Sequence, residues 1–241
     1  MRLDVYFTPG EVAAGDISDR VAVVIDVLRA TSTMVEALAN GARGVFPAAT
    51  IDDAVRVVQN LGRETALLCG ERRCLPVEGF DLGNSPAEFT AERVASKLLV
   101  MTTTNGTQAV LASNGAREIL IASFLNLEAV ASELAAADDD VAIVCAGRER
   151  RFALEDAVCA GALADRLRAR LGRRYHGNDA ADAARTLARR RGGELETLFR
   201  HTAAGRQLVE AGLEADLAAC AAIDRHAIVP RVRDRQVVLE P

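Results

Sequence analysis

The chain has 241 residues, of which half are hydrophobic, only 4% are aromatic and none is tryptophan, and its formal net charge is −5. This length is enough to bury a full core, which Ala, Val, Leu and Ile must build. The negative charge argues against non-specific binding to nucleic acid or to an anionic membrane. Five cysteines without regular spacing fit a reducing compartment. Because we recognise no signal peptide and no apolar span of about 18 residues, we expect a cytoplasmic protein that is not bound to a membrane.

Segments rich in Val and Ile alternate with segments of helical spacing up to Cys145. Strands are expected at 3–7, 21–26, 44–47, 66–69, 98–102, 118–121 and 141–145, and helices at 33–40, 52–61, 108–113 and 127–137. The stretch from Gly70 to Pro86 is predicted to be irregular. Continuous apolar strands separated by helices are typical of a mostly parallel sheet that is covered on both faces. We therefore predict an α/β fold with helices on both faces of the sheet.

The pattern becomes mainly helical after Glu155. Helices are expected at 156–170, 179–191, 194–200, 204–211 and 215–223, and short β-like segments at 227–229 and 236–239. We find no low-complexity linker and no repeat of fixed period. The sequence therefore predicts a single α/β domain over residues 1–241, with a motif-bearing part at 1–156 and a helix-rich C-terminal part at 157–241.

Polar residues follow the predicted strands at the point where each strand ends. In open parallel sheets, ligands bind beyond the carboxyl ends of the strands. A strand that leads through a polar turn into a helix can hold a phosphate with free N–H groups and the helix dipole. We expect a small, strongly anionic ligand at this edge. The candidate residues are Asp26, Arg29, Thr31 and Ser32, then Glu71 and Arg72, then Thr103, Thr104, Asn105, Gly106 and Thr107, then Ser123 and Asn126, and finally Arg148.

Carboxylates accumulate in the same regions, where Mg²⁺ could use one or two of them together with substrate phosphate and water. They are Asp26, Glu71, Asp81, Glu155 and Asp156. Other interpretations stay open for several candidates. Thr31, Ser32 and Asn126 could serve only as helix caps. Asp81 could make a local turn, and Glu155 with Asp156 could only stabilise a helix N-terminus.

Several motifs occur together in one order along the chain. They are DVLRAT at 26–31, GER at 70–72, GFDLGNSP at 79–86, TTTNGT at 102–107, SFLN at 123–126 and CAG at 145–147. With them the chain resembles the 2-phosphosulfolactate phosphatase family from about Val21 to Asp156, and more weakly at 159–161 and in the tail. The resemblance implies Mg²⁺-dependent hydrolysis of (2R)-2-phospho-3-sulfolactate to 3-sulfolactate and phosphate, a step toward coenzyme M.

The roles that we predict follow from this resemblance and from the residue types. Arg29, Arg72 and Arg148 are candidates for pairing with the phosphate, carboxylate and sulfonate of such a substrate. Arg29 is expected to line an open cleft. The predicted catalytic residues are Asp26, Arg29, Glu155 and Asp156, and the predicted metal ligands are Asp26, Glu71 and Asp81. Asn84 and Ser85 join the substrate-binding candidates named above.

Alternatives from other classes remain. Arg73 and Cys74 stand where we expect glycines, so the substrate could be a related small 2-phosphoacid. A haloacid dehalogenase mechanism is disfavoured because Leu28 occupies the position of its second aspartate. Cys145 and Arg151 have the C-x5-R spacing of thiolate phosphatases, although Glu149 would repel phosphate. A non-catalytic anion-binding module and assembly into a homo-oligomer also stay open.

Overall fold

The computed structural model describes residues 1–13 and 15–240, and within these residues it contains one sheet of eleven strands. The strand order across the sheet is β5-β4-β6-β3-β11-β10-β7-β2-β8-β1-β9. The strands are β1 (Arg2–Tyr6), β2 (Val21–Ile25), β3 (Gly44–Pro47), β4 (Ala66–Arg72), β5 (Leu75–Pro76), β6 (Leu98–Thr102), β7 (Glu118–Ala122), β8 (Val141–Cys145), β9 (His176–Gly177), β10 (Arg231–Arg233) and β11 (Gln236–Val238).

The sheet is mostly parallel, as predicted. Strand β2 pairs in parallel with β7 and β8, β1 with β8, and both β3 and β4 with β6. Every residue of β2, β6 and β8 is buried, which explains why these strands, apart from Thr102 at the end of β6, are apolar and show no alternation. Each antiparallel pair includes one of the short strands β5, β10 and β11: β5 pairs with β4, β10 with β11 and β7, and β11 also with β3.

The C-terminal hairpin lies in the middle of the sheet, between β3 and β7. Val237 of β11 pairs with Val45 of β3, and Arg231 of β10 pairs with Leu120 of β7. The β-like prediction at 236–239 is therefore confirmed, but the one at 227–229 is wrong, because the strand begins only at Arg231. Proline at position 230 has no N–H to donate to a ladder, so regular pairing starts after it.

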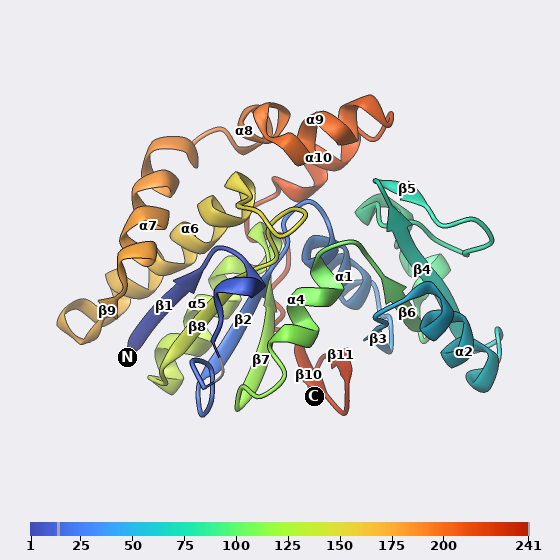
Figure 1. Ribbon diagram of the computed structural model, residues 1–241, viewed down its shortest axis with the longest axis horizontal. Coiled ribbons are helices and arrows are strands. Elements are labelled where there is room, and N and C mark those ends of the chain that lie inside the picture. The colour runs from blue at the N-terminus through green and yellow to red at the C-terminus, as the bar shows by residue number, and fades with distance from the viewer. Residues whose placement is uncertain (14, 241) are drawn as a thin grey trace.

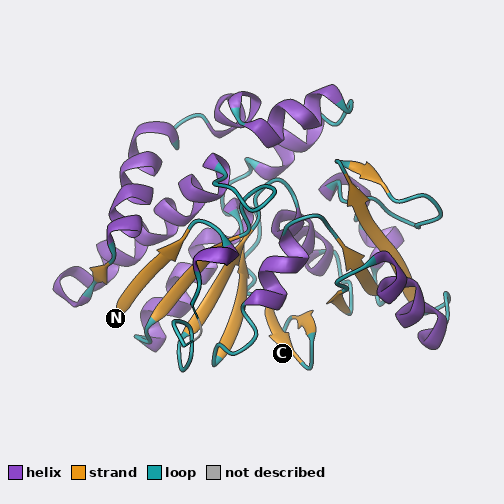
Figure 2. Ribbon diagram, viewed as in Figure 1, coloured by secondary structure: helices purple, strands orange, loops and turns teal. Residues whose placement is uncertain are grey.

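Helices cover both faces of the sheet, as expected (Figures 1 and 2). The α-helices are α1 (Ala30–Ala39), α2 (Ile51–Leu61), α3 (Ala91–Val94), α4 (Gly106–Ala112), α5 (Leu127–Ala137), α6 (Leu154–Leu171), α7 (Asp179–Arg191), α8 (Leu195–His201), α9 (Ala203–Glu210) and α10 (Ala215–Cys220). Short 3₁₀ turns occur at Pro9–Glu11, Pro86–Glu88, Phe124–Asn126 and Gly172–Arg174. No helix in the described part of the chain is both long enough and apolar enough to cross a membrane.

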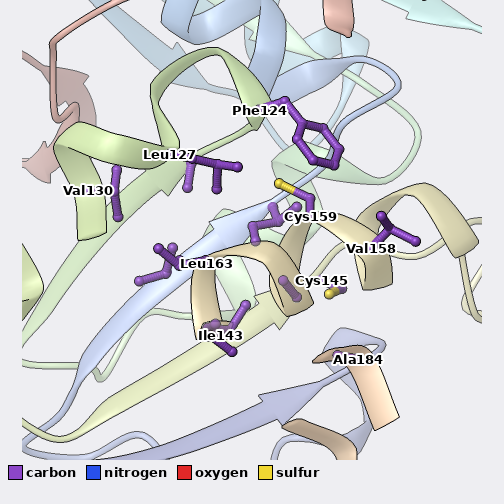
Figure 3. Close-up of a cluster of buried hydrophobic side chains, with 14 of the residues drawn as sticks. Phe124, Leu127, Val130, Ile143, Cys145, Val158, Cys159, Leu163 and Ala184 are labelled. Carbon is purple, nitrogen blue, oxygen red and sulfur yellow. The ribbon is translucent and has the colours of Figure 1, made fainter. Parts of the chain in front are cut away.

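The two faces of β2 contribute to two different cores. Val23 and Ile25 join the cluster under α5 and α6, whereas Ala22 and Val24 join the cluster under α1 and α4. This is the alternation that a strand buried on both faces must show. Figure 3 shows part of the first cluster, in which Cys145 lies among aliphatic side chains. A third cluster packs α2 against β4 and β6.

The C-terminal part is helix-rich, and it packs directly on the sheet and its helices. Gly161 of α6 allows α7 to approach, because a Cβ at this position would lie 2.0 Å from the carbonyl oxygen of Ala184. Beyond α7, the chain turns so that α8, α9 and α10 lie over the carboxyl ends of the central strands (Figure 1). These helices therefore reach the edge where the candidate residues gather.

Candidate active site

A pocket of about 70 Å³ lies at the carboxyl ends of the strands. The predicted residues that line it are Asp26, Arg29, Glu71, Asn84, Thr103, Thr104, Asn105, Arg148, Glu155 and Asp156. The lining also includes residues that were not predicted as site residues, namely Leu28, Arg73, Cys74, Gly147, Glu149, Ala204 and Gln207; of these, Arg73 and Cys74 were expected only to affect substrate preference. The pocket is therefore assembled from strand exits on both sides of the C-terminal hairpin and from α9.

Four helices begin beside the pocket. Arg29 is the residue before the first turn of α1, and Asn105 stands in the same position before α4. Glu155 lies in the first turn of α6, and Ala204 in the first turn of α9. Each helix N-terminus carries a partial positive charge of about half a unit. The arrangement favours a bound anion.

Arg29 is held in place by the protein, and its placement differs from the expected open cleft. Its Nη1 donates to Oδ2 of Asp216 at 2.6 Å, and its Nη2 donates to the carbonyl oxygen of Cys74 at 2.8 Å. Although Arg29 lines the pocket, only 4% of the residue is exposed to solvent. The side chain therefore presents a fixed guanidinium to the pocket.

Arg148 provides a second, more accessible guanidinium. Its Nη2 donates to Oε1 of Gln207 in α9 at 2.9 Å and lies 3.8 Å from Oε1 of Glu149. About a third of the Arg148 side chain is exposed. Gln207 lies in a segment whose sequence shows only helical periodicity, so no local signal pointed to it.

Four carboxylates gather around the same pocket, and burial disfavours the charged forms of Asp26, Glu155 and Asp156. Burial raises the pKa of Asp26 to about 7, with further contributions from Glu71 and Glu155. Burial likewise raises the pKa of Glu155, and it raises that of Asp156 well above the ordinary range, with Asp26 and Glu155 adding to the effect. A cation placed among these groups would reverse the trend and favour their ionised forms.

Two of these carboxylates are already occupied by protein donors. Glu71 accepts from both N and Oγ1 of Thr104 at 2.8 Å and from N of Cys74 at 2.9 Å. Asp156 accepts from N of Val27 at 2.8 Å and from N of Gly147 at 3.0 Å. Glu71 therefore braces the β4–β5 hairpin against the turn after β6. Asp156 ties together the exits of β2 and β8.

Asp26 and Asn84 keep oxygen atoms that a ligand could use. Oδ1 of Asp26 accepts only a long bond of 3.4 Å from N of Ala30. Oδ1 of Asn84 is buried and has no hydrogen-bond partner among the described residues. Buried polar atoms are nearly always paired, so the Asn84 oxygen indicates a ligand or a water molecule.

The turn at 102–107 packs against the exit of β2. A Cβ on Gly106 would lie 2.3 Å from Cβ of Ala30 and 2.6 Å from Oδ2 of Asp26, so only glycine fits there. Thr103 and Thr107 bond to each other's backbone, with Thr107 N donating to Thr103 Oγ1 at 3.1 Å. Thr107 is fully buried and outside the lining, whereas Thr103 lines the pocket. Thr107 therefore shapes the turn.

Four predicted substrate ligands make local hydrogen bonds within the protein. Thr31 Oγ1 donates to the carbonyl oxygen of Asp26 at 2.9 Å, and Ser32 Oγ donates to that of Val27 at 2.8 Å. Ser123 and Asn126 form a reciprocal capping box at the 3₁₀ turn after β7. All four are fully buried and lie outside the pocket lining. The capping interpretation therefore describes Asn126, whereas Thr31 and Ser32 bond back to the exit of β2 and do not cap α1.

Arg72, Asp81 and Ser85 also lie outside the lining. Arg72 Nη2 donates to Oγ1 of Thr102 at 3.0 Å. Asp81 accepts from N of Leu68 at 2.8 Å, so its carboxylate braces the loop beside β4 and not the pocket. Asp81, which we expected to bind a metal, therefore lies outside the residues that line the pocket. Ser85 Oγ donates to Oδ1 of Asp216 at 2.5 Å, and Asp216 in turn accepts from the pocket residue Arg29.

The turn between β4 and β5 explains why Arg73 and Cys74 reach the pocket. Both adopt left-handed backbone conformations, with φ of 53° and 70°, which glycine would adopt more easily. The stretch from Gly70 was predicted to be irregular, but β4 continues to Arg72 and forms a hairpin. Arg73 and Cys74 therefore line the pocket from a backbone conformation that is unfavourable for residues other than glycine.

The structure argues against the thiolate alternative. Cys145 is fully buried in the apolar cluster of Figure 3 and does not line the pocket. Burial raises its pKa well above the ordinary value, with Asp156 adding to the effect. A thiol that stays protonated at neutral pH is a poor nucleophile.

Comparison with known proteins extends the similarity over nearly the whole chain. The family described as 2-phosphosulpholactate phosphatase matches residues 6–235. A probable 2-phosphosulfolactate phosphatase of Symbiobacterium thermophilum is 44% identical over 226 residues, which cover 94% of this chain and 97% of the relative. A protein of Thermotoga petrophila with the same name is 40% identical over 241 residues, covering 99% of this chain and 98% of the relative. The chain belongs to the 2-phosphosulpholactate phosphatase family.

Proposed function

We propose that the protein is a Mg²⁺-dependent phosphatase that hydrolyses (2R)-2-phospho-3-sulfolactate to 3-sulfolactate and phosphate. The observation that carries this proposal is the convergence of Arg29, Arg148 and four helix N-termini on one pocket that also contains Asp26. The names of the family and of the relatives support the same reaction. Its product, 3-sulfolactate, would fit the proposed role on a route to coenzyme M.

The cationic groups suit a small substrate with several negative charges. Arg29 is fixed from behind by Asp216, so it can bind an anionic group without first losing side-chain freedom. Arg148 lies at a more exposed position and can bind a second anionic group of the same molecule. Hydrogen bonds between guanidinium and phosphate or carboxylate contribute about 1.5–3 kcal/mol each. Such contacts orient the phosphoester bond in the pocket.

The donor set fits Mg²⁺ bound together with substrate and water. Among the described residues, no three His, Cys, Asp or Glu side chains lie close enough to hold a metal by themselves. Mg²⁺ commonly uses only one or two carboxylates and keeps the remaining positions for phosphate and water. Asp26 and Glu155 would hold it, with Oδ1 of Asn84 as a neutral oxygen donor. When bound, Mg²⁺ would offset negative charge on the phosphoryl oxygens.

The chain's own residues then stabilise the reacting group. The Arg29 guanidinium and the positive ends of α1 and α4 can stabilise the phosphoryl oxygens as charge builds on them. Glu71 joins the turn at 102–107 to the β4–β5 hairpin through hydrogen bonds from Thr104 and Cys74. These bonds fix the start of α4 beside the pocket. Asp26, Arg29 and Glu155 are each no more than 6% exposed, and the low local dielectric around them strengthens each of these interactions.

The test is phosphate release from 2-phosphosulfolactate, with and without Mg²⁺ after treatment with a chelator. We expect turnover that is lost in EDTA and restored by Mg²⁺. Asp26→Asn should lower kcat by at least about 10²-fold, since it removes a carboxylate that would hold Mg²⁺ in the pocket. Asp81→Asn is the matched control and should keep near-normal activity, because Asp81 binds the loop beside β4.

The outcomes separate the alternatives. Full activity in excess EDTA would refute the role of Mg²⁺. Faster turnover of another small 2-phosphoacid would reassign the substrate, and the rim residue Arg73 would be the first position to examine. Tight binding of phosphate without any hydrolysis would instead identify a non-catalytic anion-binding protein.

A further inference from the structure

Two residues of the C-terminal helices hold the two guanidinium groups of the pocket from behind. Asp216 of α10 accepts from Arg29, and Gln207 of α9 accepts from Arg148. The two contacts differ in burial. The side chains of Arg29 and Asp216 are each only 3% exposed, whereas that of Arg148 is 31% exposed. The Arg29–Asp216 pair therefore has the lower local dielectric and the stronger electrostatic interaction.

The carboxylate of Asp216 connects two distant segments. Its Oδ2 accepts from Arg29 at the exit of β2, and its Oδ1 accepts from Oγ of Ser85 at 2.5 Å. The guanidinium is held on a second side by the carbonyl oxygen of Cys74 at 2.8 Å. An arginine carries five N–H donors, so others remain for a ligand in the pocket. Asp216 is not among the residues that line the pocket.

We propose that Asp216 is a positioning residue that fixes the Arg29 guanidinium in its ligand-binding orientation. This inference rests on the proposed function, in which Arg29 binds the phosphoester. An unheld arginine has many rotamers, and ordering it only when substrate arrives would weaken binding and turnover. Because Asp216 already orders the Arg29 side chain, substrate binding does not have to lower its conformational entropy. The carboxylate of Asp216 also offsets the charge of the buried guanidinium. Helix α10 thereby becomes part of the active-site architecture.

The test is a double-mutant cycle with Asp216→Asn and Arg29→Gln, read as kcat/KM for 2-phosphosulfolactate. Asp216→Asn keeps the size of the side chain but removes its charge. We expect it to lower kcat/KM about 10- to 100-fold in the wild-type protein. In the Arg29→Gln background the further loss should be less than about threefold, because Asp216 acts through Arg29. Additive losses would refute the positioning role, and so would wild-type activity of Asp216→Asn.

Asp4→Asn provides the matched control. Asp4 forms another buried ion pair, with Arg20 at 2.9 Å and side chains 4% and 9% exposed, on a strand that does not line the pocket. This variant should lower the melting temperature without changing kcat/KM. A similar loss of kcat/KM in both variants would mean that Asp216 has only a structural role.

Two further measurements keep the inference falsifiable. If Asp216→Asn fails to fold, Ser85→Ala removes the other hydrogen bond to the same carboxylate. It should cost about 3- to 10-fold in kcat/KM in the wild-type protein and nothing in the Arg29→Gln background. If the wild-type protein does not hydrolyse 2-phosphosulfolactate, the proposed function is wrong. The same cycle is then read from the Kd of inorganic phosphate by calorimetry, where additive effects again refute the role of Asp216.

Discussion

Gly106 offers a sharp test of the active-site geometry, because its position can be perturbed by a single methyl group. The Cβ of Gly106→Ala would lie 2.3 Å from Cβ of Ala30, whereas ordinary contact begins near 3.4 Å. It would also lie 2.6 Å from Oδ2 of Asp26. Because the Cβ of Ala30 is fixed to the backbone of α1, the starts of α1 and α4 must separate by about 1 Å.

The expected consequences follow from that displacement. A misplacement of about 1 Å between reacting groups can lower turnover by about 10²-fold, and we expect a loss of that size in kcat/KM. Overpacking of a buried position costs about 1–3 kcal/mol, which for a chain of this length lowers the melting temperature by roughly 2–12 °C. Activity loss should therefore exceed what the small unfolded fraction explains.

The assay is phosphate release and thermal melting on the same preparation, well below the melting temperature. Gly193→Ala is the control, since a Cβ there meets no atom within 4 Å, and it should match the wild-type protein in both measurements. Near-normal kcat/KM in Gly106→Ala would refute the claim that the turn at 102–107 must lie against Asp26.

Two other predictions concern Cys145 and Asp165, which do not line the pocket. Alkylating agents should leave Cys145 unmodified in the folded protein, and Cys145→Ala should keep its phosphatase activity; rapid inactivation that maps to Cys145 would restore the thiolate mechanism. Asp165 has a lowered pKa, because hydrogen bonds from Arg189 and Arg185 outweigh the opposing effect of burial. Its stabilising contribution should be present above the unfolded pKa of about 4 and lost as pH falls through the folded value. Melting curves between pH 7 and 3 should show a smaller acid-induced loss for Asp165→Asn than for the wild-type protein.

The placement of Arg29 changes what its removal should do. The sequence led us to expect a side chain in an open cleft, whose loss would affect turnover and leave stability unchanged. Arg29 is instead buried against Asp216, and removing one partner of a buried ion pair commonly costs about 3–5 kcal/mol. A lower melting temperature of an Arg29 variant therefore does not distinguish a bracing role from a catalytic one. The double-mutant cycle with Asp216 distinguishes these two roles.

Local sequence determined the parallel sheet, most helix positions and the motif segments that line the pocket. Hydrophobic periodicity is a property of neighbouring residues, so β2, β6 and β8 with the helices between them could be predicted from it. The exits of parallel strands share one edge, which is why Asp26, Glu71 and Thr104 could be expected to meet.

Only the tertiary structure decided which polar residues face the ligand and which serve the fold. A serine or asparagine after a strand has the same local pattern whether it caps a turn or binds a substrate, so Ser123 and Asn126 could not be assigned. The hairpin in the middle of the sheet and the Arg29–Asp216 pair join segments that are distant in the chain, the latter by 187 residues. Such contacts depend on how α8 to α10 return over the strand ends, and no local periodicity encodes that path.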